Sequence, residues 1–284
     1  MGLHLMGAII GDISGSWYEF RNLKQRPESL VTPRDFFTDD SVLTIAVARG
    51  MINGFSKIDR SLLAQNANAQ RCLKNEVTTS LWQFAQRYPD AGYGRTFVHW
   101  FADAAAGRGA EPYNSWGNGS AMRVSFAGWA AHSLDEALLL ARLSAEVTHN
   151  HPEGIKGAQA VAAALYLLRS GAEKNAVREY VSRFYNLNFT LDEIRPTYQF
   201  EVSCQKSVPH AINAFLEADG FEDTIKTALS IGGDSDTIAA IAGSLAEACY
   251  PIPQDLEQRA LAKLTPHLQR ELAAITAYLD LPHS

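Results

Sequence analysis

Residues 232–248 read Gly-Gly-Asp-Ser-Asp-Thr-Ile-Ala-Ala-Ile-Ala-Gly-Ser-Leu-Ala-Glu-Ala, and this stretch decides the fold. From Ile238 to Ala248 the chain is mostly small and apolar on every side, as in a helix that is buried on most of its faces. A second alanine-rich run, from Ile155 to Leu168, has the same character. We predict that these two runs are the central helices.

Helical periodicity continues through most of the remaining chain, whereas strand alternation is almost absent. The segments that show it are 42–51, 61–72, 79–87, 94–106, 137–145, 174–186, 206–217, 221–231, 255–264 and 266–280. The prolines that fall in the gaps between them are Pro27, Pro33, Pro112, Pro152, Pro196, Pro251 and Pro253. No linker, low-complexity tract or internal repeat interrupts the 284 residues. The sequence therefore predicts an all-α fold in which residues 1–284 form a single domain.

The composition indicates a soluble, cytoplasmic protein, with 46% hydrophobic and 20% charged residues. A net charge of -6 without a basic stripe argues against nucleic acid as the main partner. No segment reaches membrane-spanning length, and the apolar N-terminal run lacks the basic region of a signal peptide. The three cysteines, Cys72, Cys204 and Cys249, are far apart, so we expect them to be reduced.

Two short acidic runs, Thr38-Asp39-Asp40 and Asp234-Ser235-Asp236-Thr237, each come before an apolar helical segment. Carboxylates beside hydroxyls are the ligands that Mg²⁺, Mn²⁺ and Ca²⁺ prefer, so a metal is expected between the runs if they meet. The alternative is that these residues only cap the helices that follow. Residues 11–16, which include Asp12, are interpreted as a glycine-rich turn that, together with Glu19, brings two more carboxylates. The alternative is a loop in which Glu19 is solvated.

Two other metal-binding patterns fail on their context. An EF-hand that opens at Asp234 would need glycine and glutamate where the chain has Ala239 and Leu245. The Asp-x-Asp motif of a sugar-nucleotide transferase would need strands that the sequence does not show.

A glycine-bracketed loop, Gly117-Asn118-Gly119-Ser120, runs into Ala121-Met122-Arg123 and another apolar stretch. Backbone N–H groups at a helix start, with glycines that permit close approach, are typical of a phosphate-binding loop. His149 and His151 follow in a later loop, where each serves a phosphate contact, a metal or neither.

In this order, the motifs resemble the ADP-ribosylglycohydrolase family, which includes the dinitrogenase reductase activating glycohydrolases. The resemblance runs from about residue 7 to 253. The motifs that carry it are Gly11-Asp12 with Gly15 and Glu19, Thr38-Asp39-Asp40, the loop 117–123, Thr148-His149 and Gly233–Thr237. It implies a compact orthogonal helical bundle with two Mg²⁺ or Mn²⁺ ions in a cleft, and hydrolysis of an ADP-ribosyl linkage.

The resemblance also assigns roles to residues of this chain. The metal ligands that it implies are Thr38, Asp39, Asp40, Asp234, Asp236 and Thr237. The residues that it places around the diphosphate are Gly117, Asn118, Gly119, Ser120 and His149. A carboxylate beside the reacting sugar would manage the proton and stabilise an oxocarbenium-like state, and Glu19 is our first choice for it, followed by Asp40.

Segment 88–95 falls where the family places residues that face the leaving group, which makes Asp90 and Tyr93 candidates for substrate contacts. A carboxylate at Asp90 would pair with a guanidinium, so ADP-ribosyl-arginine on a protein is the expected substrate. A structural turn is the alternative for this segment. Other open substrates are a serine linkage, a small conjugate or a modified nucleic-acid base. A non-catalytic ADP-ribose-binding relative and another dinuclear-metal hydrolase, such as a phosphoesterase, also remain as alternatives.

Overall fold

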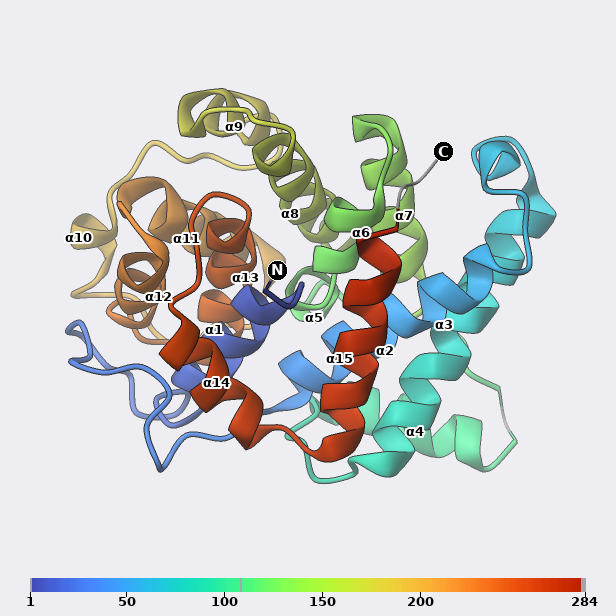
Figure 1. The fold of residues 1–284 in the computed structure, drawn as a ribbon, viewed down its shortest axis with the longest axis horizontal. Coiled ribbons are helices and arrows are strands. Elements are labelled where there is room, and N and C mark those ends of the chain that lie inside the picture. The colour runs from blue at the N-terminus through green and yellow to red at the C-terminus, as the bar shows by residue number, and fades with distance from the viewer. Residues whose placement is uncertain (1, 108, 282–284) are drawn as a thin grey trace.

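The computed structural model describes residues 2–107 and 109–281, and its regular structure there is helical (Figure 1). Apart from helices, these residues form one isolated bridge, between Gly117 and Ser203. The all-α prediction is confirmed. The elements are α1 (Met6–Ser16), α2 (Asp39–Phe55), η1 (Arg60–Leu62), α3 (Ala67–Arg87), α4 (Arg95–Ala105), α5 (Gly119–Met122), α6 (Ser125–Ala130), α7 (Leu134–Glu146), α8 (Pro152–Arg169), α9 (Lys174–Val181), α10 (Leu191–Ile194), α11 (Cys204–Glu217), α12 (Phe221–Leu229), α13 (Ser235–Glu247), α14 (Gln254–Lys263) and α15 (Pro266–Leu279).

The central helix of the fold is α13. Every residue from Ser235 to Ala246 is buried, and the helix contacts α1, α8, α11 and α12. Helix α8 is buried over most of its length as well. The two alanine-rich runs are therefore central helices, as predicted from their composition.

Helix α1 packs against α13 along a stripe of glycines, and the two ribbons lie side by side in Figure 1. A Cβ atom at Gly7 or Gly11 would lie 2.1 Å from a backbone carbonyl oxygen of α13, and one at Gly15 would lie 2.4 Å from the Cα of Asp236. The interpretation of residues 11–16 as a turn is wrong, because this four-residue glycine spacing forms one face of a helix. The close packing brings the end of α1 to the start of α13.

The periodic segments 61–72 and 79–87 do not form two helices. Residues 60–62 form the short helix η1, and α3 then runs unbroken from residue 67 to 87. Its buried face continues through Leu73, Val77 and Leu81, which are spaced four residues apart. None of the helices in the described ranges is long and apolar enough to cross a membrane.

Candidate active site

The starts of α2 and α13 meet at a group of carboxylates. The Thr237 hydroxyl donates a hydrogen bond to Asp40 Oδ2 at 3.1 Å. Asp12, Asp40 and Asp236 each offer an oxygen within 4.8 Å of the others, and the same holds for Glu19, Asp234 and Asp236. Asp236 belongs to both groups. The two acidic runs, nearly 200 residues apart in sequence, therefore form one cluster.

Asp12 holds the start of α2 in place. Its Oδ1 accepts a hydrogen bond from the Thr38 hydroxyl at 2.6 Å, and its Oδ2 accepts from the backbone N–H groups of Thr38 and Ser41. The Ser41 hydroxyl also donates to Oδ2. Sequence reasoning placed Asp12 only in a motif and missed this role. The signal for it was the pair of hydroxyl residues around the start of the next helix.

Burial and mutual repulsion raise the pKa values of these carboxylates. Burial, followed by the nearby charges of Asp12 and Asp234, raises the pKa of Asp39 to about 8. Burial and the charge of Asp234 raise the pKa of Glu19 to about 7. Burial, together with neighbouring carboxylates, holds the pKa values of Asp40 and Asp236 well above their usual range.

These residues fit divalent cations. Asp40 Oδ1 is buried and has no hydrogen-bond partner among the described residues. A buried, unpaired carboxylate oxygen is costly unless a cation or a proton satisfies it. The donor set contains only oxygen atoms, which is the chemistry that Mg²⁺ and Mn²⁺ prefer.

A cavity of about 680 Å³ opens over this cluster, and its volume is in the range of small-ligand sites. Thr38, Ser120 and Asp90 are not part of its wall. The candidate residues that line it are Glu19, Asp39, Asp40, Tyr93, Gly117, Asn118, Gly119, His149, Asp234, Asp236 and Thr237. The wall thus combines an acidic part with the loop that precedes and begins α5.

The loop 117–120 is fixed to its surroundings by hydrogen bonds. The Asn118 amide donates to Asp234 Oδ2 at 2.6 Å, and the Asn118 N–H donates to the Val202 carbonyl. The Cys204 thiol donates to the carbonyl of Gly117 at 3.0 Å. The Ser120 hydroxyl donates to a backbone carbonyl of α8, so it points away from the cavity.

His149 stands against this loop from the other side. A Cβ atom at Gly119 would lie 3.0 Å from His149 Nε2. The other ring nitrogen of His149, Nδ1, lies 2.8 Å from the Thr148 hydroxyl, and this hydroxyl accepts a hydrogen bond from Arg123. Burial, with the positive charge of Arg123, holds the pKa of His149 well below its usual range. His149 is therefore neutral at neutral pH.

Segment 88–95 borders the acidic part of the cavity. A Cβ atom at Gly92 would lie 3.8 Å from Asp39 Oδ1. Tyr93 lines the cavity, and its hydroxyl is buried without a hydrogen-bond partner among the described residues. Asp90 is exposed on the turn just before, while Arg95 contributes to the cavity wall.

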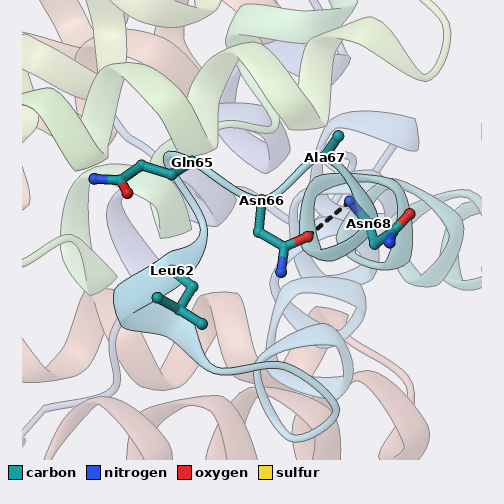
Figure 2. A pocket seen from close by; sticks show the side chains of 5 residues that line it. All are labelled: Leu62, Gln65, Asn66, Ala67 and Asn68. Carbon is teal, nitrogen blue, oxygen red and sulfur yellow. Dashed lines mark hydrogen bonds between the residues drawn. The ribbon is translucent and has the colours of Figure 1, made fainter.

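A smaller pocket of about 310 Å³ lies between η1 and the start of α3 (Figure 2). In it Asn66 Oδ1 accepts a hydrogen bond from the Asn68 N–H and caps α3. The lining residues are Leu62, Gln65, Asn66, Ala67 and Asn68. Because none of these side chains is ionisable or nucleophilic, the carboxylate-lined cavity is the better candidate for chemistry.

Known proteins with similar sequences and structures agree with this choice. The family model described as ADP-ribosylglycohydrolase matches residues 4–281. Human ADP-ribosylhydrolase ARH3 is 28% identical, over 88% of this chain and 85% of its own. ADP-ribosylarginine hydrolase Tri1 of Pseudomonas putida is 27% identical, over 94% of this chain and 76% of its own.

A solved structure described as an ADP-ribosylglycohydrolase-related protein complex has the same fold. It superposes with a TM-score of 0.66 at 23% identity and covers 97% of this chain and 94% of that one. Since the family match extends over nearly the whole chain, the protein belongs to the ADP-ribosylglycohydrolase family and is a hydrolase that removes ADP-ribose.

Proposed function

We propose that the cavity binds the ADP-ribosyl group with its diphosphate at the loop 117–120 and His149 and its distal ribose at the carboxylates. The observation that carries the proposal is the position of Asp236, which belongs to both groups of converging carboxylates. Two Mg²⁺ or Mn²⁺ ions would share this residue. Their ligands are proposed to be Thr38, Asp39, Asp40, Asp234, Asp236 and Thr237.

The bound cations supply Lewis acidity toward the ribose hydroxyls. Glu19 lies half-buried at the edge of the cluster and lines the cavity, so it is placed to accept a proton from an attacking water. Its negative charge also stabilises the oxocarbenium-like sugar carbon. Asp40, the other candidate for this role, already accepts the Thr237 hydrogen bond and lies deeper in the cluster.

For the leaving group, we propose an arginine side chain. The turn that carries Asp90 leads directly to Gly92, which lies beside Asp39. A guanidinium attached to a ribose at the carboxylate cluster would therefore emerge near the carboxylate of Asp90. Asp90 makes no hydrogen bond or ion pair with the other residues that the structure describes. The relative named ADP-ribosylarginine hydrolase supports the same linkage.

A second candidate is a neutral leaving group such as a serine hydroxyl. Arg95 lines the cavity wall, and its positive charge disfavours a cationic group there. The substrate in either case is an ADP-ribosylated protein or a small ADP-ribosyl conjugate.

The test is product analysis with ADP-ribosyl-arginine, ADP-ribosyl-serine and a phosphodiester, each with Mg²⁺, Mn²⁺ or chelator. We expect free ADP-ribose from an ADP-ribosyl substrate only when metal is present. Glu19→Gln should lower turnover by about 10²-fold and leave ADP-ribose affinity nearly unchanged. Glu28→Gln, an exposed glutamate of the same segment, is the matched control.

Two results would overturn the proposal. ADP-ribose binding without release from any conjugate would identify a non-catalytic relative. Cleavage of the phosphodiester alone would identify a different metal hydrolase.

A further inference from the structure

Two hydrogen bonds meet at the hydroxyl of Thr148. Arg123 Nη2 donates to Thr148 Oγ1 at 2.6 Å, and the same oxygen lies 2.8 Å from His149 Nδ1. All three side chains are buried, and Arg123 and Thr148 are at most 1% exposed. A series of hydrogen bonds therefore leads from Arg123 through Thr148 to the imidazole ring of His149, which lies next to Gly119.

The direction of the second bond follows from the first. A guanidinium is only a donor, so Arg123 occupies a lone pair of Thr148 and leaves the hydroxyl proton free to donate. A buried hydroxyl proton is rarely left without an acceptor. His149 Nδ1 lies 2.8 Å from this hydroxyl and can accept that proton. If Nδ1 accepts, the proton of the neutral ring is on Nε2.

The Tyr113 hydroxyl is the other polar group near Thr148. Burial raises the pKa of Tyr113 to about 12, and a hydrogen bond with the Thr148 side chain acts to lower that pKa. The Thr148 hydroxyl also lies 2.6 Å from Arg123 Nη2 and 2.8 Å from His149 Nδ1, so Tyr113 and His149 compete for its proton. If Thr148 donated to Tyr113 instead, the ring proton of His149 would be on Nδ1, so the two arrangements give opposite tautomers.

We propose that Arg123 and Thr148 are positioning residues that hold neutral His149 with its proton on Nε2, as a donor to an oxygen of a bound diphosphate. The contact with diphosphate rests on the proposed function, whereas the tautomer does not. The Nε2 edge of the ring faces the Cα of Gly119, at the loop where that diphosphate is placed. The opposite tautomer would direct a lone pair at phosphate oxygens, which repels them.

The direct test is nitrogen NMR on the ligand-free protein labelled with ¹⁵N-histidine. Long-range nitrogen–proton correlations distinguish the two neutral tautomers, and His149→Asn assigns the signals. We expect His149 to carry its proton on Nε2. A proton on Nδ1 in the wild-type protein overturns the proposal, whatever happens to the variants.

The variant test separates positioning from structural support. Thr148→Val keeps the shape and removes the hydroxyl, so it should mix the tautomers and weaken ADP-ribose binding about tenfold in calorimetry. Thr148→Ser should restore both readouts. Thr224→Val removes another buried, hydrogen-bonded threonine hydroxyl, in α12, and should change neither.

The outcomes for tautomer and binding can be told apart. Unchanged tautomer and affinity in Thr148→Val, or a Thr148→Ser protein that behaves like the valine variant, would refute the positioning role. If His149 of the wild-type protein carries its proton on Nε2 but the protein does not bind ADP-ribose, the positioning role of Arg123 and Thr148 stands and the proposed function fails.

Discussion

The side-chain amide of Asn118 donates a hydrogen bond of 2.6 Å to Asp234 Oδ2. This bond joins the loop proposed for the diphosphate to the carboxylates proposed for the metals. Both residues are buried and line the same cavity. The bond fixes the orientation of Asp234 Oδ2 and leaves Asp234 Oδ1 to face the carboxylate cluster.

Asn118→Ala is expected to weaken metal binding by about tenfold, because a ligand carboxylate that loses its outer hydrogen bond is less well oriented. ADP-ribose affinity should fall as well, since the same residue is part of the loop. Calorimetric titration with Mn²⁺, then with ADP-ribose, measures both. Asn213→Ala, a buried asparagine in α11 outside the cavity, is the control. Wild-type metal affinity in Asn118→Ala would show that the bond has no such role.

Asp236→Asn tests the shared ligand. Because Asp236 belongs to both carboxylate groups, its loss should remove bound metal and abolish activity. The metal-free variant should also be more stable than metal-free wild type, since one of several mutually repelling carboxylates is gone. Metal analysis and thermal unfolding are the measurements, with the exposed Asp255→Asn as control. Full metal content together with full activity would refute the assignment.

Metal-free protein should lose stability between about pH 6.5 and about pH 8. Glu19 and Asp39 have folded pKa values of about 7 and about 8, above their unfolded values. The folded state therefore binds more protons than the unfolded state in this range, and stability falls as pH rises. Buried His149 has the opposite effect only below about its unfolded pKa of 6.5.

Comparing the pH dependence of stability with and without metal separates the contribution of the cavity carboxylates from that of other buried acids. Burial also raises the pKa of Glu247 to about 8, but this residue ends α13, and its carboxylate accepts a hydrogen bond from the Gly7 N–H at the start of α1. Saturating Mg²⁺ or Mn²⁺ should remove the part of the pH dependence that comes from Glu19 and Asp39. Melting curves with chelator and with metal measure it, and identical slopes would contradict a metal site here.

Gly119 should not tolerate a side chain. A Cβ atom there would lie 3.0 Å from His149 Nε2 and would narrow the space proposed for the diphosphate. Gly119→Val should weaken ADP-ribose binding by orders of magnitude and leave metal content unchanged. Gly220→Ala, where a Cβ atom meets nothing within 4 Å, is the control for adding a methyl group. Unchanged affinity would reduce the loop to a structural turn.

The sequence was most informative where local pattern and tertiary packing agree. The buried runs in α8 and α13 and the hydroxyl and acidic residues before α2 could be read directly. Helix α1 could not, because glycine is a weak helix former and its spacing makes sense only against the backbone of α13. The role of Asp12 depends on that packing. The direction of the Ser120 hydroxyl, away from the cavity, could not be predicted either, since it depends on a carbonyl of α8.

The last prediction concerns the linkage. If Asp90 pairs with a leaving guanidinium, Asp90→Ala should slow cleavage of ADP-ribosyl-arginine by about ten- to a hundredfold relative to ADP-ribosyl-serine. A charge-assisted hydrogen bond of this kind contributes about 1.5 to 3 kcal/mol, and only the arginine substrate offers it. Exposed Asp90 reaches the substrate only outside the cavity wall, so the effect should weaken at high salt.

Both substrates are measured on wild type, Asp90→Ala and the control Asp59→Ala, at one metal concentration. Asp59 is an acidic N-cap at η1, away from the cavity wall. Arg95→Ala gives the complementary result, because removing a cavity-lining positive charge should favour the arginine substrate. If wild type ignores arginine conjugates, or if Asp90→Ala affects both substrates equally, the arginine linkage is wrong. A neutral leaving group beside Arg95 then becomes the better assignment.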